Sequence, residues 1–274
     1  MKRVFLWELL ISRGLFNNQK TAKSWIMAGK VIVDDQRIDK AGYLVSENAS
    51  IRVKGVKKYV GKGGLKLEGA LTDFGMNVSG KIALDVGASI GGFTDCLLQY
   101  GATKVYSVDV GYGLFAGKLR IDKRVVNLEK TNISDISPNQ LQPTPSLATV
   151  DLSYLSLKIA IPIISCLLTR NGEMICLVKP LFEVSDSSAR RTGQIKNTAV
   201  YCEILHKLVT HIDSLGLKTV GITHSHVTGS KGTREFFLRI SKDKMTPSED
   251  IGLDIQAVIA AGMKVQIYGR PRKS

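Results

Sequence analysis

The sequence has few of the residues that build disulfide frameworks or metal sites. It contains four cysteines in 274 residues, and no two of them form a C-x-x-C pair. All four lie in apolar stretches: Cys96, Cys166, Cys176 and Cys202. Scattered cysteines exclude a disulfide scaffold and predict reduced core thiols in a cytoplasmic protein. His224 and His226 alternate at an expected strand end, but zinc needs further ligands and none lies nearby, so we expect no metal.

Long apolar runs and acidic residues are also scarce. The longest apolar run, residues 159–168, contains a proline and is shorter than the roughly 20 residues that span a bilayer. The start of the chain lacks the pattern of a signal peptide, so we expect no membrane partner. The 24 acidic residues face 38 lysines and arginines, which gives a net charge of +14. Such a balance favours nucleic acid as the partner, ahead of a membrane surface.

The excess charge is concentrated in residues 1–60. This segment holds 12 basic and 5 acidic residues, a net +7. Hydrophobic spacing predicts two helices and then three short strands: helices at 5–16 and 18–29, strands at 31–33, 37–38 and 51–53. Lys20, Lys23 and Lys30 lie on the outward face of the second helix. A basic stripe on a small domain favours contact with a nucleic-acid backbone, although an ordinary solvated face is the alternative.

Strands and helices alternate from residue 81 onward. Strands are expected at 81–86, 104–110, 124–128, 147–151, 173–179, 217–224 and 234–240. Helices are expected at 92–100, 113–120, 155–169 and 198–215. This alternation predicts an α/β fold with a mostly parallel sheet of seven strands. A turn at 228–232 joins the last two strands, which should therefore pair antiparallel, and one more amphipathic stretch lies near 250–262.

Residues 83–95 carry the strongest motif. An apolar strand runs into a glycine-rich turn and then a helix, as in the nucleotide pockets of doubly wound sheets. The helix N-terminus supplies free N–H groups there. Asp85 at the strand end would repel a pyrophosphate and suits a cationic or zwitterionic ligand. We therefore expect S-adenosylmethionine (SAM), held by Asp85 and by Gly87, Ala88, Ser89, Gly91, Gly92, Phe93 and Thr94.

Polar residues at later strand ends complete the expected site. Asp109 lies 22 residues after Gly87, where an acid can bind ribose hydroxyls; a structural turn is the alternative. Asn132 follows the third strand, where an adenine amino group could be recognised. Asp151 ends the fourth strand and should face the pocket. Lys179 ends the fifth, and a partly buried lysine there is a candidate base or a snorkelling side chain.

Taken together, these motifs resemble the TlyA family of ribosomal RNA 2′-O-methyltransferases, often labelled hemolysin. The resemblance covers nearly the whole chain and rests on Arg13-Gly14-Leu15-Phe16, Gly63-Gly64-Leu65-Lys66, Asp85-Val86-Gly87-Ala88-Ser89, Asp109-Val110-Gly111-Tyr112-Gly113, Asp151-Leu152-Ser153-Tyr154 and Val178-Lys179-Pro180. The chain departs from the family's usual residues at Ile90, Leu114, Gly117, His226 and Thr233.

The resemblance implies a division of the chain. An S4-type RNA-binding domain of α+β structure would span 1–60, with Arg13 joining the three lysines of its second helix in RNA binding. A linker would follow at 61–65. An FtsJ-like domain, with the Rossmann-like fold of class I SAM-dependent methyltransferases, would span 66–245. A helix and a basic tail would complete the chain at 246–274.

The resemblance also implies a Lys-Asp-Lys-Glu tetrad at Lys66, Asp151, Lys179 and Glu235. Lys179 would deprotonate a ribose 2′-hydroxyl of ribosomal RNA, free or within a ribosomal subunit. Asp151 and Glu235 would orient the two lysines, and Lys66 would ease the deprotonation of the base. Three other functions stay open: an RNA-binding or ribosome-assembly protein that binds SAM without turnover, a SAM-dependent enzyme acting on a small molecule, and a pore-forming hemolysin.

Overall fold

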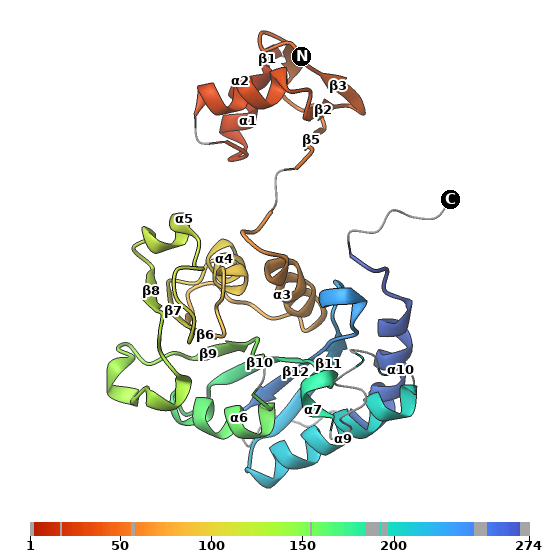
Figure 1. Ribbon diagram of the computed structural model, residues 1–274. Helices are drawn as coiled ribbons and strands as arrows, with labels where there is room; N and C mark the ends of the chain where they lie inside the picture. The colour runs from red at the N-terminus through yellow and green to blue at the C-terminus, as the bar shows by residue number, and fades with distance from the viewer. Residues whose placement is uncertain are drawn as a thin grey trace. The chain divides into compact units, whose positions relative to one another are not determined.

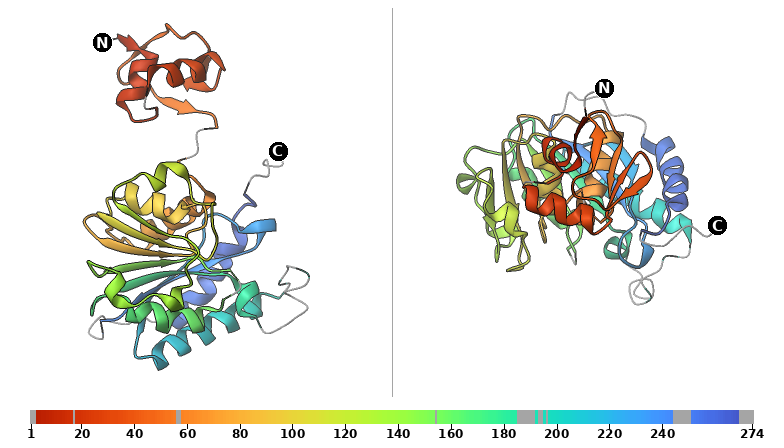
Figure 2. Two further views of the ribbon diagram at one scale, coloured as in Figure 1. Left: turned by 60° about the vertical axis from the view of Figure 1, so that its left-hand side comes forward. Right: turned by 90° about the horizontal axis from the view of Figure 1, so that it is seen from above.

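The chain folds into two compact units, residues 1–57 and 58–274. The computed structural model describes residues 3–16, 18–55, 58–153, 155–184, 192, 195, 197–243 and 251–268. The first unit is red to orange in Figures 1 and 2, and the second takes the remaining colours. Within these described ranges, we find no helix with the length and hydropathy of a membrane span.

The first unit has two helices and five three-residue strands. The helices are α1 (Leu6–Ser12) and α2 (Gln19–Met27). The strands are β1 (Arg3–Phe5), β2 (Val31–Val33), β3 (Gln36–Ile38), β4 (Leu44–Ser46) and β5 (Ile51–Val53). They pair antiparallel in two sheets, β1-β4 and β3-β2-β5. Apolar faces of both helices pack on these strands around the fully buried Leu6, Leu10, Ala22, Ile26 and Val31.

The second unit is built on a seven-stranded, mostly parallel sheet, which confirms the predicted fold class. Its strands are β6 (Ile82–Val86), β7 (Lys104–Val108), β8 (Val125–Leu128), β9 (Leu147–Val150), β10 (Glu173–Val178), β11 (Lys218–His224) and β12 (Phe236–Ser241). Their order across the sheet is β11-β12-β10-β9-β6-β7-β8. Only β12 runs antiparallel to its neighbours, β10 and β11.

Helices cover both faces of this sheet (Figure 1). On one face lie α3 (Lys62–Asp73), α4 (Gly92–Gln99) and α5 (Gly117–Arg120). On the other lie α6 (Leu157–Cys166), α9 (Thr198–Ser214) and α10 (Ile251–Lys264). Successive strand residues point to opposite faces, so Ala83 packs under α3 and α4 while Leu84 packs under α6 and α9. Four single turns complete the unit: η1 (Ile133–Asp135), η2 (Pro138–Gln140), α7 (Pro180–Glu183) and η3 (Ser230–Gly232).

Three local expectations differ from the structure. Residues 61–65, expected to form a linker, are the N-cap and first turn of α3, because Gly63 and Gly64 let this turn pack closely on the rings of Phe93 and Tyr59. The helix expected at 113–120 begins at Gly117. Cys166 is exposed at the end of α6, whereas Cys96 and Cys176 are buried as expected.

The order of the strands creates a crevice beside β6. The chain passes from β6 through β7 to β8 on one side and then returns to place β9 on the other side. Such a reversal leaves a gap between the connections that follow the two central strands, at their carboxyl ends. Residues just after β6 and β9 therefore line the natural ligand crevice of this sheet.

Candidate active site

The four residues of the expected tetrad meet at the carboxyl edge of the sheet. Asp151 directly follows β9 and Lys179 directly follows β10. Glu235 directly precedes β12, and because this strand is antiparallel to β10, its beginning lies at that same edge. Lys66 reaches the cluster from the second turn of α3.

The tetrad consists of two lysine–carboxylate pairs. Lys179 Nζ lies 2.5 Å from Asp151 Oδ1, and it also donates a hydrogen bond of 3.1 Å to Ser153 Oγ. Lys66 and Glu235 form an ion pair in which only 5% and 6% of the two side chains are exposed. Burial raises the pKa of the Glu235 carboxyl, and the ammonium of Lys66 opposes that rise. Lys179 and Asp151 are therefore accessible to a ligand, whereas Lys66 and Glu235 are almost closed to solvent.

The glycine-rich turn after β6 packs directly against the tetrad. Gly87 has a φ of +86°, and a Cβ built on it would lie 2.4 Å from the carbonyl oxygen of Asp151. Gly91, with a φ of +95°, is the N-cap of α4. This turn and the start of α3 enclose a cavity of about 230 Å³. Its lining is Gly61, Lys62, Gly63, Lys66, Gly87, Ala88, Ser89, Ile90, Gly92, Phe93 and Asp151.

Asp85 lies beneath the turn. Its side chain is fully buried and accepts hydrogen bonds from the hydroxyls of Thr94 (2.6 Å) and Thr149 (3.1 Å). Burial raises the pKa of this carboxyl to about 7. Asp85 and Thr94 therefore fasten the turn to the sheet from below. This arrangement favours a positioning role for both residues over the direct ligand contact expected from the sequence.

Two backbone hydrogen bonds fix the carboxylate of Asp109 just after the end of β7. Its two carboxylate oxygens accept hydrogen bonds of 2.7 Å from the backbone N–H groups of Ser89 and Gly111. Each oxygen keeps a lone pair that could accept a bond from a hydroxyl group. Asn132, by contrast, is an exposed N-cap whose side chain accepts a 3.2 Å bond from the backbone of Ser134.

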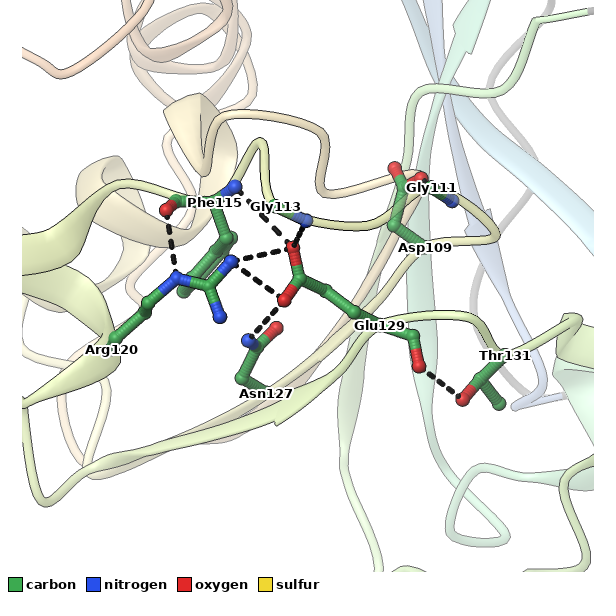
Figure 3. A network of polar contacts seen from close by, with 8 residues as sticks. All are labelled: Asp109, Gly111, Gly113, Phe115, Arg120, Asn127, Glu129 and Thr131. Carbon is green, nitrogen blue, oxygen red and sulfur yellow. Dashed lines mark hydrogen bonds and ion pairs between the residues drawn. The ribbon is translucent and has the colours of Figure 1, made fainter.

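A network centred on Glu129, a residue for which the sequence predicts no role, holds the segment after Asp109 (Figure 3). The Glu129 carboxylate accepts hydrogen bonds from the N–H of Gly113 (2.8 Å), from Asn127 Nδ2 (3.1 Å) and from Arg120 (2.7 Å). Arg120 also donates to the carbonyl of Phe115 at 3.0 Å. This anchoring explains why residues 113–116 do not join α5.

Lys62 is a further residue that the sequence analysis missed. It begins α3 and lines the cavity beside Lys66 and Asp151. The charges of all four tetrad residues act on its ammonium. The available signal was spacing, because residues i and i+4 of a helix share a face and Lys62 precedes the expected Lys66 by four.

The expected RNA-binding residues of the first unit differ in their environments. Arg13 donates two 2.7 Å hydrogen bonds to the backbone carbonyls of Ala49 and Glu47. The ammonium of Lys23 lies 5.2 Å from the ring centroid of Trp7, and that of Lys30 lies 4.7 Å from the ring of Trp25. Lys20 is exposed.

The two histidines of the expected strand end lie side by side, with ring centroids 5.3 Å apart. His226 Nε2 is 2.9 Å from the carboxylate of Asp73 on α3. Among the residues that the structure describes, no three metal-ligating side chains are arranged to hold a metal ion.

A doubly wound sheet, a glycine turn at its switch point and an acid at the end of the next strand define the class of Rossmann-like methyltransferase domains. The FtsJ-like methyltransferase family matches residues 59–242. The protein YqxC of Bacillus subtilis, named as a candidate rRNA methyltransferase, is 40% identical over 85% of this chain and 83% of its own length. The 16S/23S rRNA (cytidine-2′-O)-methyltransferase TlyA of Mycobacterium tuberculosis is 34% identical over 92% of this chain and 96% of its own.

A solved structure shares both units. A protein from Streptococcus thermophilus described as a hemolysin is 34% identical, covers 96% of this chain and 97% of its own, and superposes with a TM-score of 0.72. The chain belongs to the FtsJ-like methyltransferase family and, within it, to the TlyA family.

Proposed function

We propose that this protein methylates a ribose 2′-oxygen in ribosomal RNA, with SAM as the methyl donor and Lys179 as the general base. The observation that carries the proposal is the pairing of Lys179 with Asp151, whose side chain lines the cavity beside the glycine turn. The ribosomal substrate is proposed by analogy with the TlyA relative, a 16S/23S rRNA (cytidine-2′-O)-methyltransferase.

The chain's own residues suit a cofactor of this kind. Gly87 leaves room where a Cβ would collide with the backbone of Asp151, and Asp109 offers fixed oxygens to the hydroxyls of a ribose. The rest of the proposed binding site is Ala88, Ser89, Gly91, Gly92, Phe93, Asn132 and Asp151. When bound, SAM supplies a methyl group on a positively charged sulfur, which an oxygen nucleophile can attack.

The tetrad divides the chemical work between its two pairs. Lys179 Nζ takes the proton of the 2′-hydroxyl, and Asp151 stabilises the ammonium that this transfer creates. Lys66 and Glu235 form a fixed ion pair beneath them, which holds the start of α3 against the beginning of β12. Positioning of the hydroxyl beside the base supplies a large share of the rate.

The first unit would bring the RNA to this site. Helix α2 exposes Lys20 and places Lys23 over the ring of Trp7. Lys30, which follows the helix rather than lying on it as expected, lies over the ring of Trp25. Lysine ammonium groups on such a face can bind the phosphates of an RNA backbone. We assign this unit the role of an S4-type RNA-binding domain.

The test is transfer of tritiated methyl groups from SAM to isolated ribosomal subunits. A Lys179→Ala variant should bind SAM within twofold of the wild type, while its transfer rate should fall by about 10²–10⁴. Lys104 begins β7 and therefore lies at the amino ends of the parallel strands, away from the tetrad. Lys104→Ala should behave like the wild type in both assays. A fully active Lys179→Ala variant would remove Lys179 as the base. SAM binding with no transfer by the wild type would support a binding protein without turnover.

A further inference from the structure

Lys62 is a third cation at the active-site cavity. It lines the cavity together with Lys66 and Asp151, and it stands at the first position of α3. The close packing of this turn on the glycine loop fixes its place, because a Cβ on Gly92 would lie 3.1 Å from the backbone nitrogen of Gly64. Lys62 is therefore held at the rim of the tetrad and is not on a free surface.

The charges at the site do not balance unless Lys62 has a partner. Glu235 pairs with Lys66, and Asp151 pairs with Lys179. Across the described parts of the chain, no carboxylate lies within ion-pair distance of Lys62. While Lys179 is protonated, before it acts as the base, two neutral pairs and the ammonium of Lys62 leave a single positive charge at the cavity.

The position of this charge is unfavourable in the free protein. A helix carries a partial positive charge at its N-terminus, where a cation is destabilising. The first turn of α3 has no acidic residue, and its N-cap is Gly61. Partial burial lowers the pKa of Lys62, and the nearby charge of Lys66 lowers it further. An anion bound between Lys62 and the helix end would offset the repulsion from Lys66 and the partial positive charge of the helix N-terminus.

The proposed reaction brings such an anion close to Lys62. In an RNA strand, the 2′-hydroxyl and the 3′-phosphodiester are carried by adjacent carbons of the ribose. A hydroxyl presented to Lys179 therefore brings its phosphodiester within one side-chain length of the tetrad. We propose that Lys62 binds the phosphodiester that adjoins the target ribose and so positions the 2′-hydroxyl for Lys179. This inference rests on the proposed function.

The cofactor offers a second anion, the carboxylate of its methionine part, and salt dependence separates the two. Removing one phosphate contact makes the plot of log affinity against log salt shallower by about 0.7–0.9. A carboxylate contact in the cofactor alters SAM affinity and leaves this slope for RNA unchanged. Loss of the local fold would alter both affinities.

The experiment compares the full-length wild type with Lys62→Gln, Lys62→Arg and the control Lys81→Gln. Lys81 directly precedes β6 and therefore lies at the amino ends of the parallel strands, at the opposite end from the tetrad. Binding of rRNA is measured by fluorescence anisotropy across a KCl series, SAM binding by calorimetry, and transfer with ribosomal subunits. We expect Lys62→Gln to bind SAM within twofold of the wild type, to raise KM for the subunits about tenfold, and to show the shallower slope. Lys62→Arg should restore both, and Lys81→Gln should change neither.

Two results would overturn the assignment of Lys62: an unchanged salt slope, or weakened SAM binding with RNA binding intact. The binding arm needs no turnover. A shallower slope in a protein that transfers no methyl group would therefore retain the phosphate contact and reject the proposed function. Normal transfer with an unchanged slope would retain the proposed function and reject the phosphate contact of Lys62.

Discussion

Lys66 and Glu235 lie 169 positions apart in the sequence, yet they form a buried ion pair that joins α3 to the beginning of β12. Neither side chain can be removed alone without leaving the other charge in a site almost closed to water. The pair therefore links the helix that borders the cavity to the one antiparallel strand of the sheet.

Breaking this pair should cost more than replacing both members. Glu235→Gln leaves the Lys66 ammonium buried without a counter-charge, and we expect a loss of about 3–5 kcal/mol in the free energy of unfolding. The double variant Lys66→Met/Glu235→Gln should recover most of that loss. Urea unfolding followed by far-UV circular dichroism measures both. Both tryptophans lie in residues 1–57, so a tryptophan-fluorescence transition that stays in place is the internal control. A double variant as unstable as Glu235→Gln would contradict the expected coupling.

Gly87 should tolerate alanine far less well than its backbone conformation alone requires. Gly87 and Gly80 have φ angles of +86° and +77°, but only at Gly87 would a Cβ meet the backbone, at 2.4 Å from Asp151. Alanine in this conformation costs about 1–2 kcal/mol at either position, and the collision should add about 1–3 kcal/mol at Gly87.

The two glycine variants also differ in the functional readout. Gly87→Ala should weaken SAM binding in calorimetry, while Gly80→Ala should leave it unchanged. Equal losses of stability in the two variants, with SAM affinity retained in both, would show that the turn does not need the close approach to Asp151.

Periodicity in the sequence predicted the sheet because its strands are buried on both faces and alternate with long apolar helices. The strands β1 and β4 are not predicted, because Phe5 at the end of β1 falls in the helix expected at 5–16 and only Val45 of β4 is buried. The glycines in the first turn of α3 predict a linker because glycine favours bending. In the fold, those glycines serve close packing against Phe93 and Tyr59.

The sequence motifs also placed residues near the site more accurately than they defined the roles of those residues. Asp85 was expected to face the ligand, and it is buried beneath the turn. The sequence assigns no role to Glu129 or Lys62. The hydrogen bonds of Glu129 depend on the shape of the loop after β7, and only the spacing to Lys66 indicates the position of Lys62. Loop shape and close packing of this kind are not encoded by hydrophobic periodicity.

Asp85 should make stability fall as pH rises. Its pKa of about 7 in the fold exceeds the value of about 3.9 expected in the unfolded chain. The folded state therefore binds the proton more tightly, and stability present at low pH is lost progressively from about pH 4 to 7. Between pH 5 and 8, the free energy of unfolding of the wild type should fall relative to that of Asp85→Asn, as measured by urea unfolding at each pH. Parallel profiles for the two proteins would contradict the raised pKa.

Arg13 and Lys20 should separate folding from RNA binding in the first unit. The Arg13 guanidinium is committed to the carbonyls of Ala49 and Glu47, so Arg13→Ala should lower the free energy of unfolding of this unit by about 1–2 kcal/mol. Lys20 is exposed, and Lys20→Ala should change that free energy by less than about 0.5 kcal/mol. Tryptophan fluorescence during urea unfolding measures both, because Trp7 and Trp25 report on this unit.

If Lys20 contacts a phosphate, Lys20→Ala should also make the salt dependence of rRNA binding shallower by about 0.7–0.9. An unchanged slope would remove Lys20 from the RNA-binding face, and an unchanged unfolding transition in Arg13→Ala would show that its two hydrogen bonds do not stabilise the unit.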